Sequence, residues 1–88
     1  MPYIIQARRN DLRISATPQQ HGILCNNPGE LNFVLTETIL GYLQARGLSY
    51  LAINDIRGAL AGAQAEFERR VAYPYEDTKK EENGDVYP

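Results

Sequence analysis

The chain has little of the chemistry from which most catalytic and metal sites are built. Its 88 residues include one cysteine (Cys25), one histidine (His21), one methionine and no tryptophan. A single cysteine excludes an intramolecular disulfide, and one cysteine with one histidine is too small a set for a zinc site. The absence of a disulfide framework favours a reducing, cytoplasmic setting.

The sequence also lacks a long hydrophobic run and an excess of either charge. No stretch reaches the roughly 20 apolar residues that cross a bilayer, and the N-terminal MPYIIQARRND meets charges too early for a signal peptide. The net charge of −2 argues against binding to duplex nucleic acid, because such binding requires a basic face. A chain this short buries a small share of its surface, so we expect a soluble domain that forms a homo-oligomer.

Two segments with helical periodicity define the expected fold. The first begins at the N-cap Asn27, followed by Pro28, and stops at Gly47. Its apolar face repeats at intervals of three and four and consists of Leu31, Val34, Leu35, Thr38, Ile39, Tyr42 and Leu43. The pattern predicts one amphipathic helix between the N-cap and the glycine.

The second helix is predicted from about Leu51 to Ala72, with Ser49 as the favoured candidate for its N-cap and Asn54 as the alternative. Its apolar stripe consists of Ile53, Ile56, Leu60, Ala63, Phe67 and Val71. Pro74 is expected to end this helix, because the residue before a proline avoids the helical conformation.

The remaining segments complete a mainly α fold: a two-helix antiparallel hairpin, a short N-terminal element and extended terminal arms. The arm Met1–Gln6 is expected to be extended and to pack Tyr3 and Ile5 onto the helices. Residues 8–20 fit either a short helix or an irregular segment, and Gly22 with residues 26–29 marks a loop. We assign residues 1–75 to the helical domain and residues 76–88 to an extended C-terminal arm.

Small side chains line the second predicted helix. Gly58 and Gly62 are four residues apart and therefore lie on one ridge. Because each interior glycine costs about 1 kcal/mol relative to alanine, we expect another backbone to approach closely there. That backbone belongs to the first helix of the same chain or to a second subunit, or a ligand lies on the ridge instead. Gly58, Gly62 and Phe67 are the predicted interface residues.

Catalysis has weak support in this sequence. His21 and Cys25 are four residues apart with a flexible glycine between them, which is not the spacing of a known nucleophile and base. An enzyme would instead need acid–base chemistry from Glu66, Asp77 or Asp85 with no histidine nearby. The acidic C-terminal residues match no calcium loop. We therefore expect no enzymatic activity, no metal and no cofactor.

Cations and tyrosines gather near the C-terminus. Arg69 and Arg70 offer planar donors to a phosphate or carboxylate, although a solvated helix end would have the same residues. Asn83-Gly84 suits a type I′ turn that folds Asp85–Tyr87 back toward Lys79-Lys80, and simple fraying is the alternative. The predicted ligand-binding residues are Tyr3, Arg69, Arg70, Tyr73, Tyr75, Lys80, Asn83, Asp85 and Tyr87.

Most of the chain, and most specifically its C-terminus, resembles a family of small bacteriophage and bacterial proteins of unknown function. The matching residues are Met1 to Ile4, Gly29, Leu31, Asn32, Asn54 to Ile56, Gly58, Glu66, Arg69, Arg70, Pro74 to Asp77, Lys80 and Glu82 to Tyr87. The chain departs from the family pattern at Phe33, where tyrosine is expected, and at Pro18 and Gly22, within a segment that is helical in relatives. The resemblance implies a phage or prophage setting in the host cytosol and no particular activity.

Two functions follow as hypotheses. The first is a non-enzymatic, homo-oligomeric accessory protein that binds a small anionic, nucleotide-like ligand and thereby sequesters a host defence signal. The second is an interaction module that presents its acidic, tyrosine-bearing C-terminal arm to a host or phage protein.

Overall fold

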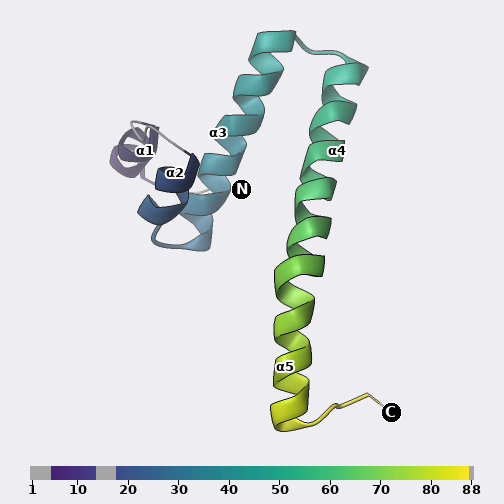
Figure 1. The fold of residues 1–88 in the computed structure, drawn as a ribbon. Coiled ribbons are helices and arrows are strands. Elements are labelled where there is room, and N and C mark those ends of the chain that lie inside the picture. Colours follow the sequence, from purple (N-terminus) through teal and green to yellow (C-terminus); the bar gives the residue numbers. More distant parts are fainter. Residues whose placement is uncertain (1–4, 14–17, 88) are drawn as a thin grey trace. The chain divides into compact units, whose positions relative to one another are not determined.

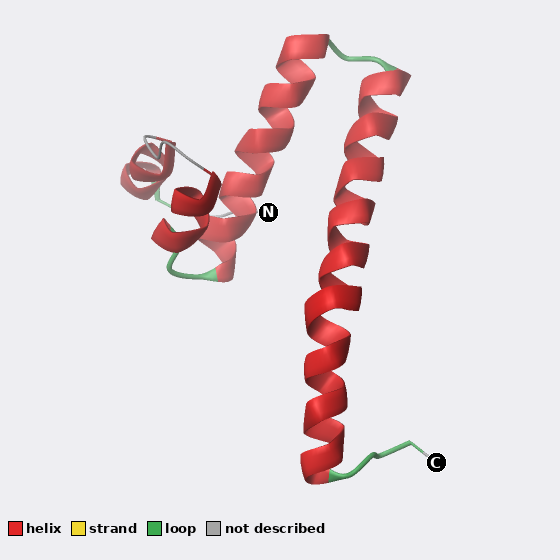
Figure 2. Cartoon of the chain, viewed as in Figure 1, coloured by secondary structure: helices red, strands yellow, loops and turns green. Residues whose placement is uncertain are grey.

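All regular structure in the described residues, 5–13 and 18–87 of a computed structural model, is helical (Figure 1, Figure 2). The predicted mainly α fold is therefore confirmed. The chain divides into two compact units, Met1–Leu48 and Ser49–Pro88. The antiparallel pairing of the two long predicted helices stays a prediction.

Unit 1 contains α1 (Gln6–Arg13), α2 (Pro18–Leu24) and α3 (Pro28–Arg46). Both short helices pack against α3. The apolar centre of this unit is small, with Leu12 from α1 and Phe33 from α3 buried. One turn before Phe33, the carboxylate residue Glu30 is also buried.

The ends of α3 are set by local sequence as predicted. The Asn27 side-chain oxygen accepts a hydrogen bond from the Glu30 N–H at 2.9 Å. At the other end Gly47 has φ +85°, and its N–H donates to the Leu43 carbonyl at 2.7 Å. Both contacts satisfy backbone groups that the helix itself leaves without partners.

Several expectations for unit 1 are corrected by the structure. Gly22 lies inside α2 and not in a loop, and Ile5 is 74% exposed, so it does not pack onto the helices. Leu31 and Leu35 of the predicted stripe are exposed, because α3 turns Phe33 toward α1 and α2 instead. Residue 3 and residues 14–17 lie outside the described residues.

Unit 2 is built on one continuous run of helix, residues 50–83, which we call the rod. It consists of α4 (Tyr50–Phe67), the π-helical turn η1 (Glu68–Ala72) and α5 (Tyr73–Asn83). The Ser49 hydroxyl oxygen accepts from the Ala52 N–H at 3.1 Å, which confirms this N-cap. The prediction that the helix ends at Pro74 is wrong, since the rod continues for two and a half further turns (Figure 1).

The π-turn explains how the rod passes a proline. Pro74 has no N–H, and in an α-helix its ring would clash with the carbonyl four residues earlier. The turn before it is widened, so that the Tyr73 N–H donates to the carbonyl of Glu68, five residues back. Single π-turns of this kind occur inside α-helices, and here one replaces the expected helix end.

The C-terminal arm is shorter than predicted. Residues 76–83 belong to α5 and are not extended. The helix ends at Gly84 with φ +85° and ψ 158°, and no described non-glycine residue has positive φ. Because a type I′ turn needs positive φ at Asn83 as well, the chain turns here through a glycine helix cap and not through a type I′ turn.

Candidate functional site

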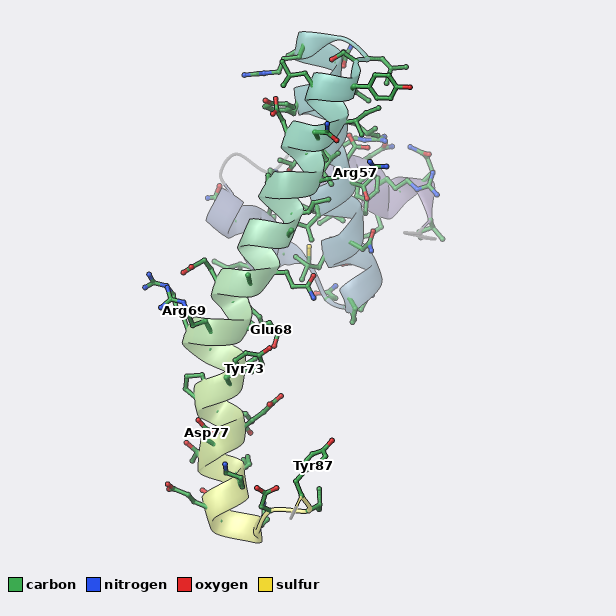
Figure 3. All side chains as sticks on the ribbon, turned by 90° about the vertical axis from the view of Figure 1, so that its right-hand side faces the viewer. Arg57, Glu68, Arg69, Tyr73, Asp77 and Tyr87 are labelled. Atoms are coloured by element: carbon green, nitrogen blue, oxygen red, sulfur yellow. The ribbon has the colours of Figure 1, made fainter. Side chains whose placement is uncertain are left out.

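The predicted ligand-binding residues that the structure describes, from Arg69 to Tyr87, are distributed along the rod and the segment after it, and they do not form one pocket. Arg69 and Arg70 lie in η1, and Tyr73 and Tyr75 begin α5. Figure 3 shows Arg69, Tyr73 and Asp77 in succession along the rod, with Tyr87 beside its C-terminal end. At 1.5 Å per residue, Arg69 and Asn83 are about 20 Å apart along the axis. The set therefore divides into an arginine group and a C-terminal group.

The arginine group is organised around Glu66. Arg69 Nη2 lies 3.0 Å and 3.1 Å from the two carboxylate oxygens, and Arg70 Nε donates to Oε2 of the same carboxylate. The hydrogen bonds from Arg70 and then Arg69 lower the pKa of Glu66. The three residues carry a net charge of +1, and all are exposed. Two guanidinium groups thus converge on one acidic group, with donors left over for another anion.

The C-terminal group forms an open pocket of about 470 Å³ at the end of α5. It unites four predicted residues, Lys80, Asn83, Asp85 and Tyr87, with five others: Glu76, Asp77, Lys79, Gly84 and Val86. The Tyr87 N–H donates to Asp85 Oδ1 at 3.0 Å, which holds the last residues in a turn. Asp85–Tyr87 therefore line the same pocket as Lys79 and Lys80, although the chain turns at Gly84 through a glycine helix cap and not through the expected type I′ turn.

The charges of this pocket do not favour an anion. Its three carboxylates and two lysines sum to −1. Lys80 Nζ also lies 3.8 Å from Asp77, and Lys79 Nζ lies 3.3 Å from Glu82. The lysines are thus engaged with carboxylates of their own helix, and the arginine group is the better place for an anionic ligand.

A row of apolar side chains runs along the rod and is exposed. We call Leu60, Ala63, Phe67, Val71 and Tyr75 the apolar row. Phe67, Val71 and Tyr75 are 59%, 53% and 62% exposed. Lys79 Nζ lies 5.5 Å from the centre of the Tyr75 ring at the end of the row. The rod is the only helix of unit 2 among the described residues, so nothing in this unit covers the row.

The glycine ridge is open in the same way. A Cβ added to Gly58 or Gly62 would meet no described atom of unit 2 within 4 Å. Eight consecutive residues, 58–65, carry no charged side chain. A helix that is uncharged on every side is normally covered by neighbours. Residues 58–65 of the rod therefore have the sequence of a buried helix, but no other helix of their own unit covers them.

Unit 1 contains a cluster that the sequence pattern did not reveal. Arg8 Nη2 lies 2.8 Å from Glu30 Oε1 and also donates to the Leu24 carbonyl, while the Asn26 N–H donates to Glu30 Oε1 at 2.9 Å. The Arg8 hydrogen bond, followed by that of Asn26, lowers the pKa of Glu30. Arg8 and Glu30 are too far apart in sequence for a local signal, so only the folded chain shows the pair.

His21 and Cys25 do not form a nucleophile and base. The Cys25 thiol donates to the backbone carbonyl of His21 at 3.0 Å, and not to its imidazole. Burial raises the pKa of Cys25 above its ordinary value, which disfavours the reactive thiolate. The contact between Cys25 and His21 therefore has a structural role at the end of α2.

A small pocket of about 190 Å³ lies where α1 and α2 meet α3. Its apolar wall comes from Leu12, Phe33 and Val34. At its rim Arg13 Nη2 lies 2.9 Å from Glu37 Oε1, and the Arg13 guanidinium lies 5.2 Å from the Phe33 ring centre. These contacts connect α1 to α3, in addition to the Arg8–Glu30 pair.

Two further properties can be stated for the described part of the chain. It contains no group of three or more histidine, cysteine or acidic side chains placed to hold a metal ion. Its helices also include none whose length and hydropathy would allow it to cross a bilayer.

Comparison with known proteins places the chain in a family. No curated protein and no solved structure matches it. A family model described as "Domain of unknown function (DUF6899)" matches residues 1–86, which is nearly the whole sequence. The match agrees with the resemblance to a family without an assigned activity. The chain belongs to the DUF6899 family.

Proposed function

We propose that this protein is a non-enzymatic accessory protein that self-assembles through the rod and, once assembled, binds a small anionic, nucleotide-like ligand at Arg69 and Arg70. A phage or prophage origin, and sequestration of a defence signal in the host cytosol, belong to the same proposal. The setting is supported only by the resemblance, noted from the sequence, of the chain to small phage and bacterial proteins.

One observation carries the assembly: the apolar row is exposed along a helix that has no neighbour in its own unit. Isolated helices are marginal in water, and most helical stability in proteins comes from packing an apolar face. A row with two exposed aromatic side chains therefore favours a partner surface of similar character. A second copy of the chain supplies such a surface without requiring any other protein.

The ligand part of the proposal is supported by the arginine group. Arg69 and Arg70 converge on one carboxylate, which shows that both donors reach the same point in space. Guanidinium groups bind carboxylates and phosphates through paired hydrogen bonds. Tyr73 is exposed close by in sequence and offers a ring face to a planar base.

The interaction module remains the second candidate, and one observation favours it. Val86 and Tyr87 are 94% and 79% exposed beyond the end of α5. Apolar residues next to Asp85 suit a short acidic peptide that docks into a basic groove. Because α5 extends to Asn83, removal of residues 84–88 is the appropriate test. If this segment only binds a partner protein, its removal should leave thermal stability and oligomer state unchanged. If it closes a ligand site, its removal should reduce ligand retention.

Native mass spectrometry of the protein purified from its natural host, before and after denaturation, tests the main proposal. We expect an oligomer that carries a nucleotide-sized additional mass, released on denaturation. Arg69→Ala/Arg70→Ala should lose the additional mass and keep the oligomer, while Arg57→Ala, a charge change elsewhere on the rod, should keep both. A monomer without additional mass rejects the proposal, and an oligomer without additional mass rejects its ligand part.

A further inference from the structure

The spacing of the apolar row changes at the π-turn. Leu60, Ala63 and Phe67 follow steps of three and four, which keep side chains on one face of an α-helix. Val71 and Tyr75 then follow in two further steps of four. In an α-helix of 3.6 residues per turn, each step of four drifts by about 40° around the axis. Three such steps in succession would carry Tyr75 off the face.

The π-turn corrects this drift. It closes its hydrogen bond from Tyr73 to Glu68, one residue further back than an α-turn does, so it takes up about one additional residue. The turn lies between Phe67 and Tyr75, where the drift accumulates. The consequence is that Val71 and Tyr75 stay in line with Leu60 and Phe67, and the exposed row is longer than an uninterrupted α-helix would allow.

The lower part of the row is symmetric about its middle residue. Phe67 precedes Val71 by four residues and Tyr75 follows it by four. If a second copy lies antiparallel on the row with Val71 at the two-fold axis, Phe67 meets Tyr75 of the second copy, and this contact occurs twice. Aromatic pairs of this kind are favourable beyond the area that they bury, and a two-fold interface requires such self-complementarity.

Charge at the end of the row favours this orientation over a parallel one. Lys79 lies over Tyr75 and is paired with Glu82. Parallel copies would place each Lys79 beside the other, and each Glu82 beside the other. Antiparallel copies place Lys79 beside Ala63 of the second copy, where its aliphatic stem covers a small apolar side chain.

We propose that a second copy of this chain packs antiparallel on the apolar row, with Val71 at the two-fold axis, and that the Pro74-dependent π-turn holds Tyr75 in the contact. This inference rests on the self-assembly proposed above and specifies its geometry. Each aromatic side chain offers about 150–250 Å² for burial. Phe67 and Tyr75 are about three-fifths exposed, so the two rings supply on the order of 200–300 Å² per partner, and the rest of the roughly 800 Å² of a standard interface must come from Val71 and the side chains that flank the row.

Disulfide cross-linking tests the geometry. In a Cys25→Ser background, which has no other cysteine, Val71→Cys should form a covalent dimer on mild oxidation. Phe67→Cys alone should not, whereas a mixture of Phe67→Cys and Tyr75→Cys proteins should form the mixed dimer. Tyr73→Cys is the control, because two residues after Val71 a side chain points to the opposite side of the rod. Efficient cross-linking of Phe67→Cys alone would overturn the antiparallel arrangement.

Pro74→Ala tests the role of the π-turn. The substitution restores an N–H, so η1 should become α-helical and Tyr75 should leave the row. We expect unchanged or higher helicity by circular dichroism, together with a dissociation constant for self-association at least tenfold higher by analytical ultracentrifugation. Self-association of Pro74→Ala equal to that of the wild type would overturn the role of the turn. A monomeric wild-type protein would reject the self-assembly itself, whereas an oligomer in which Val71→Cys fails to cross-link would reject only this geometry.

Discussion

Arg8 Nη2 lies 2.8 Å from Glu30 Oε1, and this pair joins α1 to the first turn of α3. Arg8 also holds the last carbonyl of α2 at Leu24. One side chain therefore connects the three helices of unit 1, in a unit whose described apolar centre consists of Leu12 and Phe33. The loss of one partner from such a charged pair leaves the other poorly solvated and unpaired.

Glu30→Gln should lower the thermal unfolding midpoint of unit 1 by several degrees, because the Arg8 guanidinium then loses the carboxylate with which it is paired. Glu37→Gln is the matched control, since Glu37 pairs with Arg13 at 2.9 Å in a half-exposed site, where ion pairs contribute little. Thermal unfolding followed by circular dichroism compares the two variants. Equal midpoints would show that the Arg8 pair adds nothing to stability.

The same pair predicts a pH dependence. The pKa of Glu30 is lower in the folded chain than its ordinary value, chiefly because of the Arg8 hydrogen bond. Its contribution to stability is therefore fully present above the unfolded-state pKa of about 4.3, and it is lost as pH falls through the folded-state pKa. The midpoint difference between wild type and Glu30→Gln should be constant from pH 7 to 5 and shrink below pH 4. A difference that grows on acidification would contradict the assignment.

Asn27→Ala should destabilise unit 1 by about 1 kcal/mol, because the Glu30 N–H loses its side-chain acceptor. Asn26→Ala is a close control, since Asn26 contacts Glu30 through its backbone N–H, which alanine keeps. Urea unfolding of both variants measures the difference. Two variants of equal stability would mean that Asn27 is dispensable as a cap.

Gly58→Ala and Gly62→Ala distinguish the stability of the helix itself from the strength of self-association. Each should raise helix stability by about 1 kcal/mol in the isolated chain, where an added Cβ meets no described atom of unit 2. Gly58 and Gly62 are each two residues from Leu60 and therefore lie on the opposite side of the rod from the apolar row. Each substitution should weaken self-association only if the assembly has a second contact, on the ridge, in addition to the contact on the row. Circular dichroism at low concentration and ultracentrifugation at high concentration report the two effects. Stabilisation at both concentrations would exclude the ridge from the interface.

Gly84→Ala should open the C-terminal pocket. Gly84 has φ +85° and ψ 158°, a region that is nearly exclusive to glycine and costs other residues about 1–3 kcal/mol. Nuclear magnetic resonance should show Tyr87 losing its defined environment, while residues before Lys80 keep theirs. Gly41, within α3, does not have positive φ, and a Cβ added there would meet no described atom within 4 Å. Gly41→Ala is therefore the control and should stabilise its helix. An unaltered Tyr87 signal in Gly84→Ala would show that the glycine cap does not hold this segment.

The sequence predicts best the features that depend on neighbouring residues. Asn27, Ser49 and Gly47 terminate helices through their own side chains or backbone freedom, so their roles follow from the local pattern. The prediction of a helix end at Pro74 is wrong because the rule for proline describes an α-helix, and the chain avoids the clash by widening one turn. A widened turn leaves no pattern in residue types beyond the proline itself.

The contacts between the helices of unit 1 could not be predicted from the local sequence pattern, for a different reason. Burial of Phe33 in place of Leu31 and Leu35 depends on where α1 and α2 contact α3. The Arg8–Glu30 pair likewise requires two helices to meet. For the candidate site, Arg69 and Arg70 were recognisable as neighbouring cations, but their shared carboxylate and the division of the predicted residues along the rod depend on the helix passing Pro74.

Because α4, η1 and α5 form one continuous run of helix, unit 2 has a single helix dipole along the whole rod. Its positive end lies at Ser49 and its negative end at Asn83, where Glu81 and Glu82 oppose the dipole and Lys80 supports it. The C-terminal end should therefore open more readily than the N-terminal end. Amide hydrogen exchange should therefore be fastest near Asn83 and slow in the turns that follow the Ser49 cap, with a local increase at the π-turn. The free energy of local helix opening should thus decrease along the rod from Ser49 to Asn83.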